Sequence, residues 1–234
     1  MTPDTRGTRI QTVGTPGGDA RITWHPAEAP RLVLALGHGA GGGVEARDLR
    51  ALATALPPLG VTVALVEQPW RVAGRKLAPA PKTLDAGWRA VWPALAEAGS
   101  PVVAGGRSAG ARVACRTATE LGAYAVLALS FPLHPPGKPE KSRAAELLGA
   151  GVPTLVVQGG NDPFGKPAEF PDAGDACDAG GENLAGTDGG GAYALCEVPG
   201  ADHAFAVAKG AAVSQEQALA IITANVAEWA AKLA

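Results

Sequence analysis

Hydrophobic residues gather along this chain in short, continuous runs instead of alternating with polar residues. Each run is rich in branched side chains and ends at glycine, proline or a small polar residue. Continuous apolar runs are typical of strands that are covered by helices on both faces of a sheet. The runs that predict such strands, the last of them the weakest, are residues 31–39, 61–69, 101–106, 125–132, 153–160 and 192–200.

The segments between these runs repeat their apolar residues at intervals of three and four, which predicts helices. Pro93 interrupts one of these stripes and should kink or break that helix. Asp85 and Ser214 lie where N-terminal caps are expected. The predicted helices are residues 46–56, 84–98, 108–121 and 214–234.

Strands and helices alternate, which predicts a mostly parallel sheet with right-handed crossovers and helices on both faces. Ahead of it, residues 9–14 and 20–26 have the pattern of an antiparallel pair. Only about 20 residues separate the fourth and fifth runs, which leaves no room for a large lid. We therefore expect one three-layer, doubly wound α/β domain over residues 1–234, with minimal or no lid and an exposed glycine-rich loop at about 172–191.

Composition narrows the class of protein further. Hydrophobic residues make up 47% of the chain, charged residues 18%, and the net charge is -2, so a globular protein is expected and binding to nucleic acid or a membrane is not. The N-terminus lacks an apolar signal segment, and the 3 cysteines are irregularly spaced. These features favour a cytoplasmic protein without a disulfide framework, and a Cys177–Cys196 bridge closing the glycine-rich loop is the alternative.

A glycine-rich turn after the third predicted parallel strand carries the most informative chemistry. Gly106-Arg107-Ser108-Ala109-Gly110 has the form G-x-S-x-G and opens a predicted helix. In such a turn the serine Oγ is lifted clear of the sheet, and small neighbours let strand and helix cross closely. An incidental serine is the alternative in a chain with 32 glycines, but the strand before and the helix after it favour a nucleophile.

A serine hydroxyl is a weak nucleophile that needs a base, and the base needs an orienting carboxylate. In hydrolases with this turn, the acid and then the histidine follow the serine, on loops after later strands. Asp162 follows the run at 153–160, and His203 follows the run at 192–200. We predict that Ser108, Asp162 and His203 form a catalytic triad.

Other residues compete for two of these roles. His134 follows the strand next to the serine and is the main alternative base, whereas His38 is better suited to supporting the turn after the first parallel strand. Chain order favours His203. Asp202 is the alternative to Asp162, but an immediate neighbour of the histidine in an extended loop usually points away from it.

The glycine-rich turn at residues 37–43, GHGAGGG, follows the first parallel strand. One N–H of this turn should act with the N–H of Ala109 as an oxyanion hole, with Ala40 as the first choice and Gly39 as the second. A phosphate-binding loop is the alternative, but the turn lacks the lysine of G-x-x-x-x-G-K-[ST] and the acidic residue that follows G-x-G-x-x-G.

Basic residues lie where the carboxyl edge of the sheet is expected, and ligands bind at that edge in open α/β sheets. Arg71, Arg75, Arg107 and His134 are therefore candidate substrate-binding residues, and the arginines would favour an anionic or polar acyl group. Solvated loop charges or ion pairs are the preferred interpretation. The acidic residues at 172–191 lack the spacing of a calcium loop, so we expect no metal, and the triad needs no cofactor.

The chain resembles the α/β-hydrolase superfamily and, more narrowly, the KANL/Tex group of small hydrolase-like proteins near the dienelactone-hydrolase-like enzymes. The likeness implies the three-layer fold and the triad Ser108, Asp162 and His203. Dienelactone hydrolases use a cysteine where this chain has Ser108, so their reaction is not implied. The segments that carry the likeness, within residues 32–207, are LALGHGAGG, PWRVAGRKLAPAPKTLD, GGRSAGARVACR, SFPLHPPGKPEKSR, GGNDPFG and PGADHAF.

The sequence therefore predicts a serine hydrolase, carboxylesterase- or thioesterase-like, that cleaves a small or soluble acyl ester through an acyl-enzyme. A small-molecule ester is the expected partner, and the protein is expected to be a monomer or a small homo-oligomer. The alternative is a binding or scaffold protein that keeps the fold without turnover. A complete triad argues against that alternative, because a site that no longer catalyses a reaction is free to lose any of the three residues.

Overall fold

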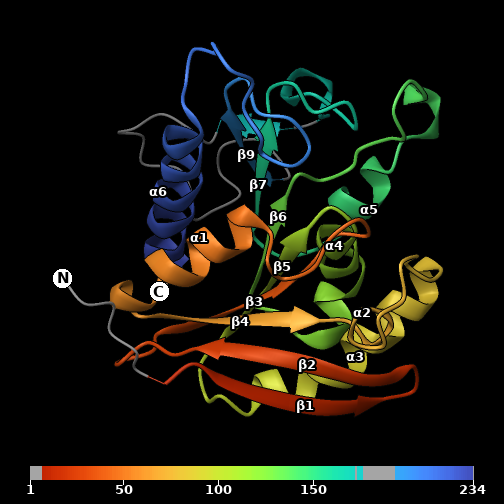
Figure 1. Cartoon of the computed structure of the whole chain (residues 1–234), viewed down its shortest axis with the longest axis vertical. Helices are drawn as coiled ribbons and strands as arrows, with labels where there is room; N and C mark the ends of the chain where they lie inside the picture. Colours follow the sequence, from red (N-terminus) through yellow and green to blue (C-terminus); the bar gives the residue numbers. More distant parts are fainter. Residues whose placement is uncertain (1–6, 172, 176–192, 234) are drawn as a thin grey trace.

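A computed structural model describes residues 7–171, 173–175 and 193–233 of the chain. Their strands form one sheet in the order β1-β2-β4-β3-β5-β6-β7-β9-β8 (Figure 1). β2 is antiparallel to both of its neighbours, and every other pairing is parallel. The strands are β1 Arg9–Thr15, β2 Gly18–His25, β3 Leu32–Gly37, β4 Val61–Glu67, β5 Val102–Arg107, β6 Ala125–Leu129, β7 Thr154–Gly159, β8 Ala173–Asp175 and β9 Tyr193–Val198.

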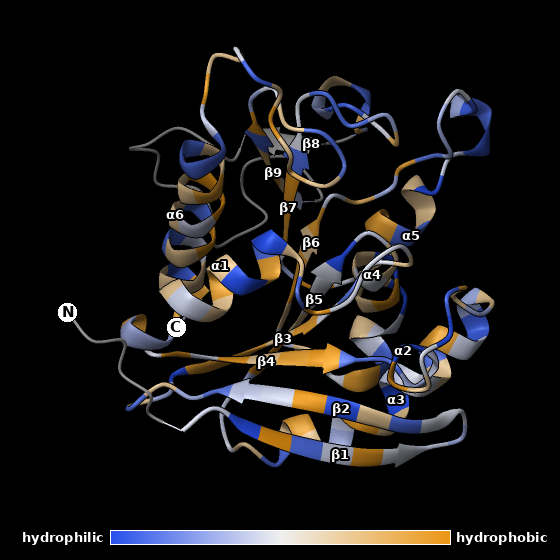
Figure 2. Cartoon of the chain, in the orientation of Figure 1, coloured by the Kyte–Doolittle hydropathy of each residue, from blue (hydrophilic) through white to orange (hydrophobic). Residues whose placement is uncertain are grey.

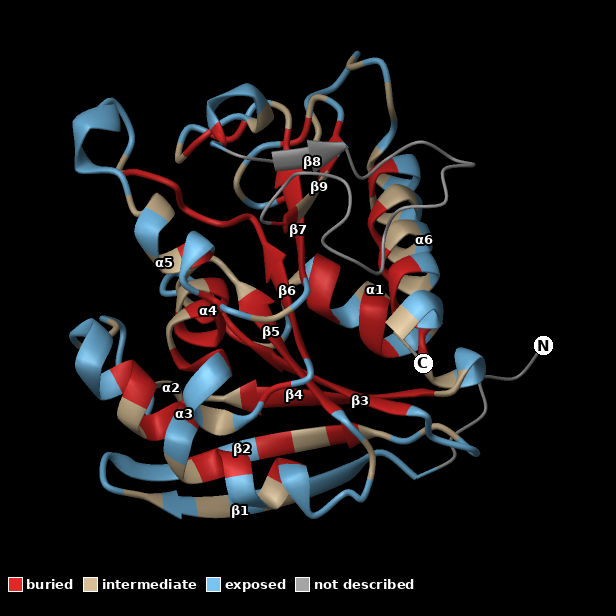
Figure 3. Cartoon of the chain, turned by 180° about the vertical axis from the view of Figure 1, so that it is seen from behind, coloured by how far each residue is buried: buried red, intermediate tan, exposed pale blue. Residues whose placement is uncertain are grey.

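Helices cover both faces of this sheet, with α1 and α6 on one face and α3, α4 and α5 on the other (Figure 1). The central strands are therefore hydrophobic along their length and buried on both sides, whereas β1 at the edge is half exposed (Figures 2 and 3). The helices are α1 Arg47–Ala55, α2 Pro69–Val72, α3 Pro81–Ala96, α4 Ala109–Leu121, α5 Ala144–Leu148 and α6 Gln215–Leu233.

Each strand and each longer helix that the sequence predicts is present, which confirms the predicted α/β architecture. Ser214 caps α6 as expected, because it exchanges hydrogen bonds with Gln217. The prediction for Asp85 was wrong: α3 begins at Pro81, a favourable first helical residue. Asp85 instead lies inside the helix. The helix is also not broken at Pro93, three residues before its last residue, Ala96.

The segment between β6 and β7 contains only a 3-10 turn at Pro139–Lys141 and the short helix α5, so no lid covers the sheet there. The predicted glycine-rich loop at 172–191 lies mostly outside the described residues. Its residues 173–175 form β8, a short strand parallel to β9, and are not loop as predicted. The alternative Cys177–Cys196 bridge involves Cys177, which also lies outside them. Among the described helices, none has the length and apolar character that a bilayer crossing requires.

Candidate active site

Ser108 lies in the sharp turn between β5 and α4, with φ 54° and ψ −110°. A positive φ is unfavourable for a residue with a side chain, so it persists only where the surrounding structure enforces it. The N–H of Ser108 donates to the carbonyl of Leu129 on the neighbouring strand β6 at 2.9 Å, which anchors the turn. This is the geometry of a nucleophile elbow.

The glycines on either side of Ser108 are required by close packing. A Cβ atom at Gly106 or at Gly110 would lie 2.5 Å from the carbonyl oxygen of Gly37 at the end of β3. At Gly106 it would also lie 2.8 Å from the carbonyl carbon of Gly110. The sequence predicted that strand and helix cross closely here. The structure adds that the end of β3 also packs against this turn.

The structure brings the three predicted triad residues together. Nε2 of His203 lies 2.9 Å from Oγ of Ser108, and Nδ1 of His203 lies 2.8 Å from Oδ2 of Asp162. Because a carboxylate only accepts, Nδ1 carries a proton, and in a neutral imidazole Nε2 is then left as an acceptor for the serine hydroxyl. The proton arrangement therefore suits a histidine that takes a proton from Ser108.

Asp162 is fully buried, and hydrogen-bond donors surround it. Besides His203, the side chain of Gln158 donates to its Oδ2 at 2.9 Å, and the backbone N–H of Phe164 donates to its Oδ1 at 2.8 Å. Gln158 also donates to the carbonyl of Gly165 at 2.8 Å. Sequence reasoning missed Gln158, although a glutamine at the end of the apolar run TLVVQGG was a signal that could have revealed it.

The backbone around His203 is shaped by Asp202, the residue considered as an alternative acid. Oδ1 of Asp202 accepts the N–H groups of Ala204 at 2.7 Å and Ala206 at 2.8 Å. The carboxylate of Asp202 therefore stabilises the turn, and the imidazole of His203 is hydrogen-bonded to Asp162 instead. On the other side, the ring of Phe164 packs against that of His203 with 4.2 Å between the ring centroids.

The two rival histidines have other partners. Nε2 of His134 lies 3.0 Å from Oε2 of Glu169, and Nδ1 lies 2.9 Å from the carbonyl of Pro135, so neither nitrogen faces Ser108. The hydrogen bond to Pro135 raises the pKa of His134, and the pairing with Glu169 raises it further. His38 supports its turn, as expected, because Nδ1 lies 2.8 Å from the carbonyl of Gly39.

The turn after β3 lies directly over the nucleophile. A Cβ atom at Gly39 would lie 3.4 Å from Cβ of Ser108. Among the described residues, no acceptor receives the N–H of Ala40 or of Ala109. Both residues also line one pocket. Two free donors near the serine are what an oxyanion hole requires.

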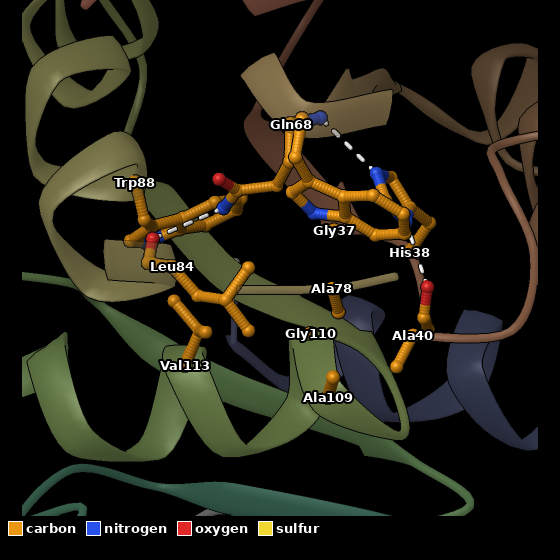
Figure 4. Close-up of a pocket in the computed structure, with 12 residues that line it drawn as sticks. Gly37, His38, Ala40, Gln68, Ala78, Leu84, Trp88, Ala109, Gly110 and Val113 are labelled. Atoms are coloured by element: carbon orange, nitrogen blue, oxygen red, sulfur yellow. Dashed lines mark hydrogen bonds between the residues drawn. The ribbon is translucent and has the colours of Figure 1, made fainter. Parts of the chain in front are cut away.

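The pocket extends from this point between α2, α3 and α4 and is partly open to solvent. Figure 4 shows Ala40 and Ala109 on one side and Leu84 and Trp88 on the other. Its walls are mostly apolar, and Gln68 and His38 are the polar side chains among them. The lining residues are Gly37, His38, Gly39, Ala40, Gln68, Trp70, Ala78, Leu84, Trp88, Ala109, Gly110 and Val113.

None of the four predicted substrate-binding residues lines this pocket. Arg71 pairs with Glu45 at 3.2 Å, and Arg75 is exposed on the loop after α2. His134 is paired with Glu169, as described above. Arg107 points away from the pocket, toward α1 and the loop that carries His203. The positive charges are therefore held apart from the apolar space beside Ser108.

The acidic residues of the glycine-rich loop raise the question of a metal site. Within residues 7–171, 173–175 and 193–233, no three His, Cys, Asp or Glu side chains are grouped so that they could hold an ion. The acidic residues that prompted the question belong to 172–191, and all of them except Asp175 lie outside this range.

Comparisons with known proteins agree with this fold. A family model described as an alpha/beta hydrolase domain matches residues 29–231. No curated protein matches the sequence. A lidless α/β serine hydrolase from Xanthomonas campestris is similar in structure, with a TM-score of 0.66, 18% identity, and coverage of 96% of this chain and 95% of that chain.

Two further solved structures share the architecture. The esterase domain of a Rhodothermus marinus protein has a TM-score of 0.63 and 12% identity, over 96% of this chain and 98% of that domain. A dienelactone hydrolase from Anabaena variabilis has a TM-score of 0.65 and 19% identity, over 95% of this chain and 96% of that enzyme. At these identities the neighbours establish the fold, and the family model establishes membership. The chain belongs to the alpha/beta hydrolase family.

Proposed function

We propose that this protein is a serine hydrolase that cleaves a small acyl ester or thioester through an acyl-enzyme. The observation that carries the proposal is the continuous hydrogen-bonded chain from Ser108 through His203 to the buried Asp162. Each member has the partner that its role requires: the nucleophile faces a base, and the base faces a carboxylate.

In the first half of the reaction, the Ser108 hydroxyl proton passes to Nε2 of His203 while Oγ bonds to the acyl carbon. The N–H groups of Ala109 and Ala40 stabilise the negative charge that develops on the acyl oxygen. The protonated His203 then gives its proton to the leaving alcohol or thiol as the bond from the acyl carbon to oxygen or sulfur breaks.

In the second half, a water molecule gives a proton to His203 and attacks the acyl-enzyme. The carboxylic acid leaves as Ser108 regains its proton from His203, so the enzyme returns to its starting state. Asp162 holds the imidazole in one orientation through both halves and stabilises its positive charge.

The pocket favours an uncharged acyl group. No Asp, Glu, Lys or Arg is among its lining residues. Burial lowers the pKa of His38, so this ring is neutral at neutral pH. A charged acyl group would lose its hydration here without gaining an ion pair, which is unfavourable.

The proposal is tested with a small fluorophosphonate, followed by intact mass measurement and mapping of the modified peptide. We expect a single adduct on Ser108 that is absent in His203→Ala. His134→Ala is the matched control, a buried histidine outside the triad, and should be labelled like the parent. Ser108→Ala should remove hydrolysis of small activated esters without unfolding the protein. Absence of an adduct on the folded parent would contradict the proposal and favour a binding role.

A further inference from the structure

Arg107, the residue directly before the nucleophile, contacts three separate parts of the site. Its Nη2 donates to the backbone carbonyl of His203 at 2.7 Å, and its Nε lies 3.5 Å from Oδ2 of Asp48 on α1. A Cβ atom at Gly39 would lie 3.7 Å from its Nη1, so the guanidinium also lies against the turn after β3.

The side chain of Asp48 is fully buried, which is unusual for a carboxylate. The side chain of Arg107 is 13% exposed. Asp48 lies in the first turn of α1, where the helix dipole favours a negative charge. Burial raises the pKa of the Asp48 carboxyl, and the charge of Arg107 opposes this rise. A carboxylate buried this deeply is costly unless a cation faces it, so each side chain restrains the other.

The segment around His203 has little regular structure of its own to hold it. It lies between β9 and α6, and an isolated bridge between Ala201 and Val207 closes it. The hydrogen bond from Arg107 ties this segment to the residue next to Ser108, although Arg107 and His203 are 96 positions apart in the sequence. Arg107 therefore links the segment that carries the base to the turn that carries the nucleophile.

We propose that Arg107 is a positioning residue that holds the His203 backbone at the correct distance from Ser108, and that the buried Asp48 fixes its guanidinium for this purpose. This inference rests on the proposed function. Because a displacement of about 1 Å of a catalytic group can cost about 100-fold in rate, loss of the contact should slow the reaction of Ser108 far more than it weakens substrate binding.

The test uses Arg107→Met, which keeps the aliphatic stem, and the double variant Arg107→Met with Asp48→Asn. The double variant removes the buried charge that the single variant leaves unpaired, so it should fold even where the single variant does not. Reaction of Ser108 with the fluorophosphonate should slow by about 10- to 100-fold, and kcat for an activated ester should fall with little change in KM. Arg107→Lys should recover part of the loss.

A spectroscopic measurement separates positioning from general stability. The proton between His203 and Asp162 should give a low-field proton NMR signal in the parent, and the signal should broaden or disappear in the double variant. Arg116→Met is the matched control, because Arg116 lies further along α4 from Ser108 and forms a largely buried pair with Asp85 at 2.6 Å. It should lower stability without changing the signal or the rate.

A folded double variant that reacts at the parental rate and keeps the signal would overturn the inference. A parent without an adduct would instead contradict the proposed function, while the dependence of the histidine signal on Arg107 would still test the positioning role.

Discussion

The backbone N–H of Gln68 donates to Nε2 of His38 at 3.1 Å, so the turn after β3 is tied to the end of β4 by one imidazole. Because Nε2 accepts, the ring proton lies on Nδ1, where it meets the carbonyl of Gly39. This bond holds in place the turn that provides Ala40 to the proposed oxyanion hole. Only the neutral form of His38 can make both contacts.

This arrangement predicts a dependence of stability on pH. Burial lowers the pKa of His38 from its usual 6.5. As the pH falls below about 6.5, the unfolded chain binds a proton that the folded protein does not, so the folded state loses stability. Glutamine does not titrate in this range. We therefore expect the free energy of unfolding in urea to fall less in His38→Gln than in the parent between pH 7.5 and pH 5.5, about one unit either side of the usual pKa. Parallel losses in both proteins would contradict the prediction.

The two candidates for the acid, Asp162 and Asp202, can be distinguished by mutation. Asp162→Asn should lower kcat by about 10³- to 10⁴-fold, because an amide cannot hold the imidazole in the required tautomer. Asp202→Asn should keep most of the activity, since an amide oxygen can still accept the N–H groups of Ala204 and Ala206. Steady-state kinetics on one activated ester checks both variants. A reversed order would assign the acid to Asp202.

Gln158 should hold the carboxylate of Asp162 in place through its hydrogen bond. In Gln158→Met, Asp162 loses one donor and the carbonyl of Gly165 loses its partner, which should lower the free energy of unfolding by about 1–3 kcal/mol. The rate of hydrolysis should fall by about 10-fold, because the carboxylate is less firmly held. Urea unfolding and kcat/KM measure the two effects. Parental activity in a folded variant would show that Asp162 needs no support from this side chain.

The glycines of the elbow should be intolerant of a side chain. Gly106→Ala places a methyl group against the carbonyl of Gly37, and we expect a loss of about 1–3 kcal/mol in the free energy of unfolding. Gly41→Ala is the control, because a Cβ atom there meets nothing within 4 Å. The free energy of unfolding of Gly41→Ala should differ from that of the parent by no more than about 0.5 kcal/mol in the same urea titration. Equal stabilities for the two variants would argue against this packing.

Much of the fold and the candidate triad could be predicted from the sequence alone. Continuous apolar runs indicate strands buried on both faces, and helical spacing indicates the segments between them. The elbow motif defines a position on the sheet, and chain order then limits the acid and the base to the loops that carry Asp162 and His203. These inferences need only local pattern and the order of elements.

The partners of the polar side chains were decided only by the tertiary structure. Arg107 was a candidate for substrate binding, but it faces Asp48 and the carbonyl of His203. Asp85 was expected to cap a helix, but it pairs with Arg116 on α4 at 2.6 Å. Periodicity shows which side of an element is buried. It cannot show which residue of a distant element lies opposite, because that depends on how the helices and strands pack against one another.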